Sequence, residues 1–228
     1  MKIYYNGWEL PYFNKAINFR NYQSYLIKKY ISGLVAEIGA GYGVNLKFYY
    51  KFASKIHLFE PSKNLYRILK KKIKKKNLKI FSRPLNKNIK NKYNTIIYLD
   101  VLEHITNDIS EIIKAYNALK KNGYLIISVP AFQHLFSKFD LDLGHIKRYR
   151  KKDFEIIAKK IKAEIVLIKY YDSIGYFLSL ASKLLSKEYK KNFKLKIMIW
   201  DKMIIISKLL DLLTLNLLGK SLLIIIKK

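Results

Sequence analysis

The fold of this chain is decided by residues 35–45, whose sequence is Val-Ala-Glu-Ile-Gly-Ala-Gly-Tyr-Gly-Val-Asn. An apolar strand expected over Leu34–Ile38 runs directly into three glycines, Gly39, Gly41 and Gly43, and a helix is expected from Leu46. Glycine allows positive φ and lets a backbone approach a ligand more closely than a Cβ permits. A glycine loop between a strand and a helix is the usual nucleotide cradle of an open parallel sheet. We therefore expect a ligand here, the alternative being a glycine-rich turn that binds nothing.

Two details of this loop indicate which ligand it suits. The spacing is Gly-x-Gly-x-Gly, whereas a pyrophosphate is held by Gly-x-Gly-x-x-Gly. Glu37 lies inside the strand, where its charge would repel a phosphate and attract a cation. The sequence thus favours a positively charged ligand without phosphate and disfavours a dinucleotide-dependent oxidoreductase.

Two further acidic residues directly follow predicted strands. Ile56–Phe59 reads as a second strand followed by Glu60, whose carboxylate can accept hydrogen bonds from ribose hydroxyls. Pro61 is expected to begin the next helix at its first position. The buried strand Tyr93–Leu99 is followed by Asp100, and ligands of open α/β sheets bind beyond such strand ends. An ordinary surface acid is the alternative for Glu60.

Together with the segment Leu-Asp-Val-Leu-Glu-His-Ile, residues 99–105, these features resemble the class I S-adenosylmethionine-dependent methyltransferases of the type 11 and type 23 groupings. The resemblance implies a Rossmann-like α/β fold with a seven-stranded, mostly parallel sheet of order 3-2-1-4-5-7-6, flanked by helices. It also implies S-adenosylmethionine as the cofactor. The implied cofactor-binding residues are Glu37, Gly39, Ala40, Gly41, Gly43, Asn45, Glu60, Pro61, Asp100 and Val101.

The acceptor side is expected in the long loop of residues 131–150, because loops of this length are usually functional. Gly144-His145, with Arg148 and Tyr149 shortly after, resembles a segment that covers the acceptor site in these groupings. His145 could take a proton from an acceptor, Arg148 could hold an anionic group, and Tyr149 is expected beside them. His104 is a second candidate base, and either histidine could instead be structural. No metal site is expected.

The resemblance implies methyl transfer to an oxygen or nitrogen of a small-molecule acceptor: a quinone precursor, a sugar, a lipid-linked intermediate or an amino compound. Asn-Pro-Pro-Tyr-type loops, which mark methylation of amino groups on bases, are absent. The alternative is a basic methyltransferase-like binding module that acts on nucleic acid or on a membrane surface.

The formal charge of the 228-residue chain is +29. Specific nucleic-acid sites favour Arg for bidentate contacts, but nearly all of this excess is Lys. We therefore expect solvated lysine faces and no nucleic-acid partner. The absence of Cys excludes disulfides and thiolate chemistry. The first residues contain no apolar signal-peptide core, so a cytoplasmic location, with peripheral membrane contact left open, is expected.

One methyltransferase domain is expected over residues 1–228. Its parts are an N-terminal helical cover (1–30), a cofactor-binding core (31–170), a helical insertion or cap (171–218) and the last strand (219–228). The cover is predicted as one helix over residues 12–30, with Asn14 as N-cap. Tyr22 or Tyr25 could reach the cleft, but simple packing is the favoured interpretation for each. Lys and Asp interrupt the apolar runs of the insertion, which argues against a membrane span. Peripheral membrane contact or a homodimer through residues 174–213 are alternatives to a cap.

Overall fold

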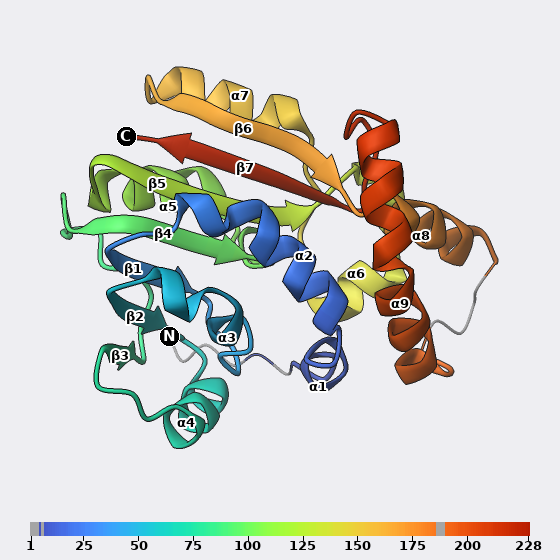
Figure 1. Ribbon diagram of the computed structural model, residues 1–228, viewed down its shortest axis with the longest axis horizontal. Coiled ribbons are helices and arrows are strands. Elements are labelled where there is room, and N and C mark those ends of the chain that lie inside the picture. The colour runs from blue at the N-terminus through green and yellow to red at the C-terminus, as the bar shows by residue number, and fades with distance from the viewer. Residues whose placement is uncertain (1–4, 6, 186–189) are drawn as a thin grey trace.

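The computed structural model describes residues 5, 7–185 and 190–228. Its centre is a seven-stranded sheet of order β3-β2-β1-β4-β5-β7-β6, which confirms the predicted fold (Figure 1). Neighbouring strands are parallel except where β7 pairs antiparallel with both β5 and β6. The strands are β1 Leu34–Ile38, β2 Lys55–Phe59, β3 Leu78–Phe81, β4 Tyr93–Leu99, β5 Leu119–Pro130, β6 Glu164–Tyr171 and β7 Ser221–Lys227.

Helices cover both faces of the sheet, and the predicted helical insertion is present between β6 and β7 as α8 and α9 (Figure 1). The α-helices are α1 Leu10–Phe13, α2 Ile17–Ile27, α3 Leu46–Tyr49, α4 Lys63–Lys72, α5 Asp108–Ala118, α6 Lys138–Leu143, α7 Lys151–Lys160, α8 Ser173–Leu185 and α9 Phe193–Leu213. Short 3-10 turns are η1 Lys28–Tyr30, η2 Tyr50–Phe52, η3 Leu102–His104 and η4 Gln133–Leu135.

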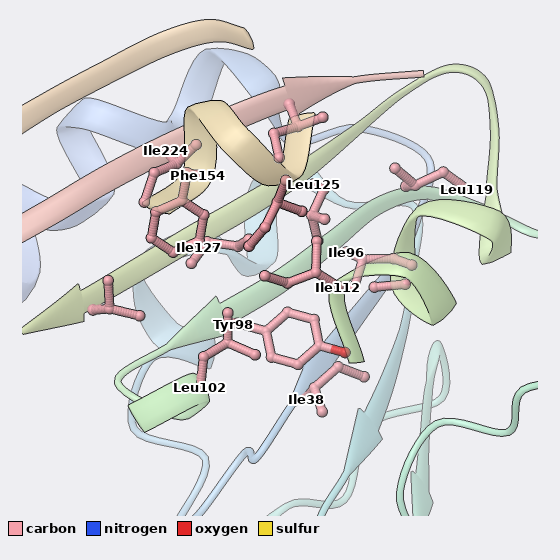
Figure 2. Close-up of a cluster of buried hydrophobic side chains, with 14 of the residues drawn as sticks. Ile38, Ile96, Tyr98, Leu102, Ile112, Leu119, Leu125, Ile127, Phe154 and Ile224 are labelled. Atoms are coloured by element: carbon pink, nitrogen blue, oxygen red, sulfur yellow. The ribbon is translucent and has the colours of Figure 1, made fainter. Parts of the chain in front are cut away.

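The hydrophobic core forms two layers, one on each face of the sheet. Along β4, Ile96 and Tyr98 pack on the side of α5 and α7, while Ile97 and Leu99 pack with α2, α3 and α9. Figure 2 shows the first layer, in which Phe154 of α7 lies over the sheet. Parallel strands buried on both faces need nearly continuous apolar sequence, which explains the long apolar runs seen in the chain.

The leading segment differs from its prediction because a distant acid caps a helix inside it. Asn14 is the C-cap of α1, so the single helix predicted over residues 12–30 is wrong. The first amides of α2 instead bind Asp201 of α9, with Asn18 N to Oδ2 at 3.2 Å and Phe19 N to Oδ1 at 2.9 Å. A helix begins where its free amides find acceptors. This acceptor lies far along the chain and left no local signal.

Two other boundaries also move. The helix after β2 begins at Lys63 with Ser62 as N-cap, so Pro61 precedes the helix and is not its first residue. The segment expected as a long loop contains η4 and α6, and Ser137 and Asp140 form a capping box at the start of α6. This second difference matters for the site, because α6 fixes the residues that follow it.

Buried aspartates attach the inserted helices to the body. Asp172 accepts hydrogen bonds from Trp200 Nε1 at 2.8 Å and from Ser207 Oγ at 2.9 Å. Asp211 accepts one from Tyr22 OH at 2.8 Å, and Tyr25 is 65% exposed. Tyr22 therefore packs, as the favoured interpretation had it, and neither Tyr22 nor Tyr25 lines the cavity described below. Buried charges need such partners to offset their lost hydration, so these contacts hold α8 and α9 in place.

Candidate functional site

The candidate site lies where β1, β2 and β4 end together. Ile38 of β1 is in register with Phe59 of β2 and Tyr98 of β4, so the residues that follow these strands meet at one edge. The strand order reverses between β1 and β4, the position where open α/β sheets bind ligands. A cavity of about 460 Å³ opens there, within the usual size range of small-molecule sites.

The glycine loop forms one wall of this cavity, and its three glycines serve different purposes. All three have positive φ, from +54° to +71°. A Cβ on Gly39 would lie 2.6 Å from Val101 Cγ2, and one on Gly43 would lie 2.3 Å from Ile73 Cδ1. Among the residues that the structure describes, the nearest atom to a Cβ on Gly41 would be Leu10 Cδ1 at 4.0 Å. Gly39 and Gly43 therefore allow tight packing, whereas Gly41 leaves room for a ligand.

Glu37 lies beneath the loop and does not line the cavity. Its carboxylate accepts hydrogen bonds from Asn45 Nδ2 at 2.9 Å and from Tyr49 OH at 2.5 Å. Burial raises the pKa of Glu37 to about 6, although these two hydrogen bonds oppose the shift. Asn45 does line the cavity, and its Oδ1 is buried without a partner among the described residues. Glu37 thus orients Asn45, whose free oxygen is available to a donor on a ligand.

Glu60 lines the cavity together with Pro61 and is already tied to the loop. Its Oε2 accepts a hydrogen bond from Gly41 N and its Oε1 one from Ser62 N, both at 2.8 Å. Burial raises the pKa of Glu60 above its ordinary value, although these two backbone donors oppose the shift. A carboxylate has about four acceptor positions, so two remain for the hydroxyls of a ligand.

Arg20 of α2 was not identified from the sequence. Its Nη1 lies 3.4 Å from Asp100 Oδ2, and both residues line the cavity. Arg20 Nε is buried and has no partner in the part of the chain that the structure describes. Asp100 has φ +58°, an uncommon value that Asp tolerates better than most residues. Arg20 thus places a cation at the cavity wall, and in so basic a chain no pattern singles it out.

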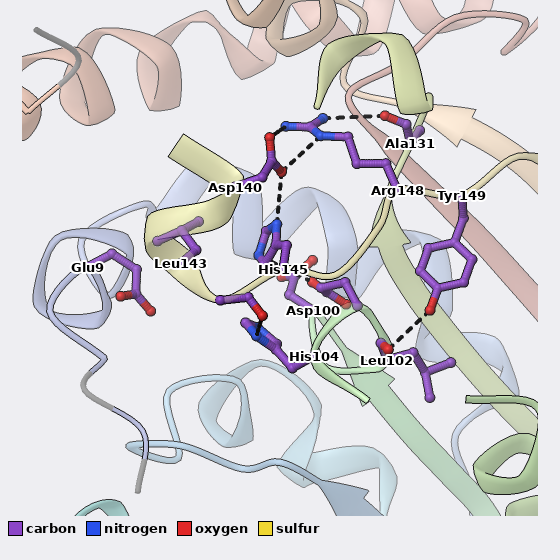
Figure 3. Close-up of polar contacts among 12 residues, drawn as sticks. Glu9, Asp100, Leu102, His104, Ala131, Asp140, Leu143, His145, Arg148 and Tyr149 are labelled. Atoms are coloured by element: carbon purple, nitrogen blue, oxygen red, sulfur yellow. Dashed lines mark hydrogen bonds and ion pairs between the residues drawn. The ribbon is translucent and has the colours of Figure 1, made fainter. Parts of the chain in front are cut away.

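A hydrogen-bonded cluster centred on Asp140 forms the wall next to α6 (Figure 3). Gly144, at φ +78°, ends α6 and turns the chain back, so that His145 Nδ1 lies 2.8 Å from Asp140 Oδ1. Arg148 Nε and Nη2 bind the same carboxylate at 2.9 and 3.1 Å. Burial acts to raise the pKa of Asp140, but the bonds from His145 and Arg148 outweigh it and hold the pKa below its ordinary value.

Glu103 and His104 lie beside His145 in the same cavity. His104 Nδ1 lies 3.1 Å from Gly144 O, and the two imidazole rings are 4.9 Å apart. Burial and the neighbouring His145 lower the pKa of His104 to about 4. Glu103 is 1% exposed, and neither carboxylate oxygen has a partner among the described residues. The structure therefore brings the two predicted histidines together and adds an acid to them.

The other two predicted acceptor residues have different surroundings. Arg148 lines the cavity, but its guanidinium is bound by Asp140 and by Ala131 O, the latter at 3.3 Å. Tyr149 does not line the cavity, and its hydroxyl donates to Leu102 O at 3.0 Å and to Asp108 Oδ2 at 2.8 Å. Tyr149 therefore lies outside the candidate site, and Arg148 serves first to hold Asp140.

Further residues line the cavity that the sequence did not indicate: Glu9, Phe13, Phe19, Trp200 and Lys220. Trp200 comes from the insertion, and Lys220 Nζ lies 4.3 Å from the centre of its ring. Burial lowers the pKa of Lys220, against the opposing charge of Asp172. The leading segment and the insertion thus border the cavity, in the places where a cover and a cap were expected, although no local pattern indicated these particular residues.

Comparison with known proteins shows the class to which this fold belongs. A family model described as a methyltransferase domain matches residues 20–167, more than half of the chain. The structure is similar to that of an S-adenosylmethionine-dependent methyltransferase from Archaeoglobus fulgidus, with TM-score 0.64, 16% identity, and 96% and 97% of the two chains covered.

Two other solved structures are similar in fold. A putative methyltransferase from Bacillus halodurans gives TM-score 0.62 at 12% identity, covering 91% of this chain and 98% of that one. The cyclopropane synthase MmaA2 from Mycobacterium tuberculosis gives TM-score 0.62 at 12% identity, covering 92% and 83%. No curated protein matches the sequence.

The fold is that of the class I methyltransferases, and the chain belongs to the methyltransferase domain family. The cofactor of this class is S-adenosylmethionine. The cavity fits it: Gly41 leaves a space that a Cβ would fill, Glu60 has acceptor positions to spare, and Arg20 Nε and Asn45 Oδ1 are buried polar atoms without described partners. These groups match ribose hydroxyls, a carboxylate and an ammonium group.

Proposed function

We propose that this protein transfers a methyl group from S-adenosylmethionine to an oxygen or nitrogen of a small-molecule acceptor. The observation that carries the proposal is the continuity of one cavity, which is lined by the glycine loop and Glu60 and also by Glu103, His104 and His145. A methyl donor held by the first group and an acceptor beside the second would share one continuous cavity. The mixed lining of aromatic, acidic and imidazole groups suits a small organic acceptor better than an extended polymer.

Each residue then has a physical task in binding. Glu60 would hold the ribose, Asn45 and the Gly39–Gly41 backbone the amino acid part, and Arg20 its carboxylate. Asp100 and Val101 would line the adenosine. When bound, the cofactor supplies an electrophilic methyl group on a sulfonium. The residues of the chain provide alignment and exclude water, which is the main source of acceleration in such a displacement.

A proton must leave the acceptor if it arrives protonated, and the cluster beside α6 offers a route. Asp140 holds His145 through Nδ1, which leaves Nε2 to accept a proton. His104 is held by Gly144 O in the same way. The low pKa of His104 keeps it neutral at physiological pH but also makes it a weak base, so His145 is the better candidate to take the proton.

Calorimetric titration with S-adenosylmethionine and S-adenosylhomocysteine tests this proposal, with NADH as the control ligand. We expect both sulfur ligands to bind with micromolar affinity and NADH not to bind. Glu60→Ala should weaken both by ~1–3 kcal/mol, because the ribose hydroxyls lose their acceptor. Glu155→Ala, at an exposed acid of α7, is the matched control and should bind normally. Failure of the folded protein to bind either ligand would exclude the proposed enzyme.

We also propose that the insertion contacts a membrane surface, because α9 buries acidic side chains and exposes apolar ones, the reverse of an ordinary surface helix. Its inner face contains the buried acids Asp201 and Asp211, while its outer face exposes Ile205, Leu209 and Leu212 by 58–69%. Lys202 and Lys208 lie exposed on the same helix. Among the described residues no helix has the length and apolarity needed to cross a bilayer. Exposed apolar residues beside lysines suit the surface of an anionic bilayer, from which a lipid-linked acceptor could be taken.

A further inference from the structure

Glu103, His104 and His145 form a cluster whose side chains could bind a metal ion together, which proton transfer by a histidine does not require. The atoms of these three side chains that could bind a metal lie within 4.8 Å of one another. Two segments bring them together, since Glu103 and His104 belong to η3 while His145 follows α6. Backbone contacts join the segments, with Ile146 N donating to Glu103 O at 2.8 Å. The arrangement is therefore built into the fold.

Glu103 is the residue that calls for an explanation. Its side chain is buried, and neither oxygen has a hydrogen-bond partner among the described residues. Leaving a buried carboxylate unpaired is costly, so such groups are normally paired or bind a cation. His145 Nε2 lies 3.9 Å from Glu103 Oε1, too far for a hydrogen bond but close enough for both to contact one ion. The carboxylate lines the cavity, where a ligand can reach it.

The two imidazoles have, at Nδ1, the supporting contacts usual for metal-binding histidines. His145 Nδ1 is held by Asp140 Oδ1 and His104 Nδ1 by Gly144 O, at 2.8 and 3.1 Å. Because each Nδ1 faces an acceptor, it carries the proton, and the lone pair of each ring is on Nε2. A carboxylate or carbonyl behind a ligating histidine is the common supporting contact of metal sites. Arg148 binds Asp140 in turn, so Asp140 and Arg148 together set the orientation of His145.

We propose that Glu103, His104 and His145 bind a divalent metal ion in the acceptor part of the cavity. Two imidazoles and one carboxylate suit Zn²⁺, Mn²⁺ or Fe²⁺ better than Mg²⁺ or Ca²⁺, which prefer sites made of oxygen ligands. Three protein ligands leave positions open on the ion. Resting on the proposed methyl transfer, this assignment narrows the acceptor to a compound with a hydroxyl group, because the open positions would bind its oxygen and favour loss of its proton to solvent. With the ion bound, the two imidazoles act as its ligands and the ion takes over their proposed role in deprotonation.

Binding of Mn²⁺ to the full chain, followed by electron paramagnetic resonance, tests the proposal, with Zn²⁺ added as a competitor. We expect one Mn²⁺ per chain, displaced by Zn²⁺. Glu103→Gln keeps the shape of the side chain and removes its charge, and it should weaken Mn²⁺ binding at least about tenfold. His145→Gln should have a similar effect, which provides a second variant if the first does not fold.

His134→Gln is the matched control. His134 lies outside the cluster, where its Nε2 contacts Tyr176 OH at 3.1 Å, so its replacement should leave Mn²⁺ affinity unchanged. Equal Mn²⁺ binding by the original chain and by both cluster variants would overturn the proposal. So would the absence of binding by Mn²⁺ and Zn²⁺ at about 1 mM, the weak limit of a useful site.

Titration of S-adenosylhomocysteine into the same metal-free samples separates this inference from the proposed function. Binding of S-adenosylhomocysteine without any metal binding would refute the metal site and leave the methyltransferase proposal intact. Metal binding without affinity for S-adenosylmethionine or S-adenosylhomocysteine would support the metal site and refute the proposed methyl transfer. In the expected case both bind, and methylation of a catechol or another hydroxyl acceptor is stimulated by Mn²⁺ and abolished by a chelator.

Discussion

At the scale of single residues, the glycine loop shows how one motif can contain two kinds of constraint. Gly41 and Gly43 have similar backbone conformations, with φ of +54° and +71°. Only the surroundings of an added Cβ differ: open cavity at Gly41, and the side chains of Leu69 and Ile73 at Gly43. Spacing in a sequence cannot separate a glycine needed for ligand space from one needed for packing.

The matched substitutions Gly41→Ala and Gly43→Ala should therefore have different effects. Both incur backbone strain of about 1 kcal/mol because alanine disfavours positive φ. Gly43→Ala should lower the free energy of unfolding further, because Leu69 and Ile73 must move, and should affect S-adenosylhomocysteine affinity less. Gly41→Ala should weaken that affinity at least about tenfold, since its methyl group occupies ligand space. Urea unfolding and calorimetry measure the two quantities, and identical effects of both variants would contradict this division.

The sequence is most informative at the single-residue scale for residues adjacent to a strand end. Glu60 and Asp100 line the cavity because the end of a buried strand fixes their position, and their contact with the cofactor stays a prediction. Glu37 and Tyr149 were expected at a ligand, yet neither lines the cavity, since their orientation depends on Tyr49 and Asp108. Arg20 and Lys220 also line the cavity, but the sequence did not distinguish them from the many other lysines and arginines of this chain.

At the scale of elements, strand and helix positions followed from apolar periodicity. The boundaries of α4 and α6 were missed although their caps are local, whereas the start of α2 is set by a distant contact. The start of α2 depends on Asp201, and α9 is separated from α2 by most of the chain. The residue before Asp201, Trp200, lines the cavity, as do Phe19 and Arg20 of α2. The contact between α2 and α9 thus holds part of the cavity wall in place.

Asp201→Asn should disturb both stability and binding. The change keeps the size of the side chain but removes the charge that favours a helix N-terminus, and one amide oxygen replaces two carboxylate oxygens. We expect the free energy of unfolding to fall by about 1–2 kcal/mol and S-adenosylhomocysteine affinity to fall severalfold through Arg20. Asp142→Asn is the control, since Asp142 is exposed and lies on α6. Unaltered stability of Asp201→Asn would show that the contact does not stabilise α2.

At the scale of the whole molecule, the distribution of acids is unusual. The chain has sixteen Asp and Glu residues, and among the described residues ten of them are buried. These buried acids cap helices, support the glycine loop and bind the inserted helices to the body. The acids are thus largely removed from the surface, and the formal charge of +29 understates how basic that surface is. The sequence shows the total charge but not this separation.

Sedimentation with vesicles tests the proposed contact of α9. The protein should bind vesicles of phosphatidylcholine and phosphatidylserine and bind weakly to phosphatidylcholine alone. Ile205→Ser with Leu209→Ser should reduce binding about tenfold through lost apolar burial. The control pair, Ile109→Ser with Ile156→Ser, replaces exposed residues of α5 and α7 and should bind normally. Equal binding by both pairs would assign the attraction to lysine charge alone, and a dimer that dissociates only in the α9 pair would indicate self-association instead.

The two-sided character of α9 has a kinetic consequence. Trp200 faces the cavity and Ile205 faces outward on the same helix, which is about 10 Å across. A bilayer seated on the outer face would then place its dissolved molecules within one helix diameter of the reaction space. Turnover of a lipid-borne acceptor should follow the number of acceptor molecules per unit area of bilayer. Adding inert lipid at a constant total amount of acceptor would lower the acceptor density in the bilayer. The reaction should then slow, although the bulk concentration of the acceptor is unchanged.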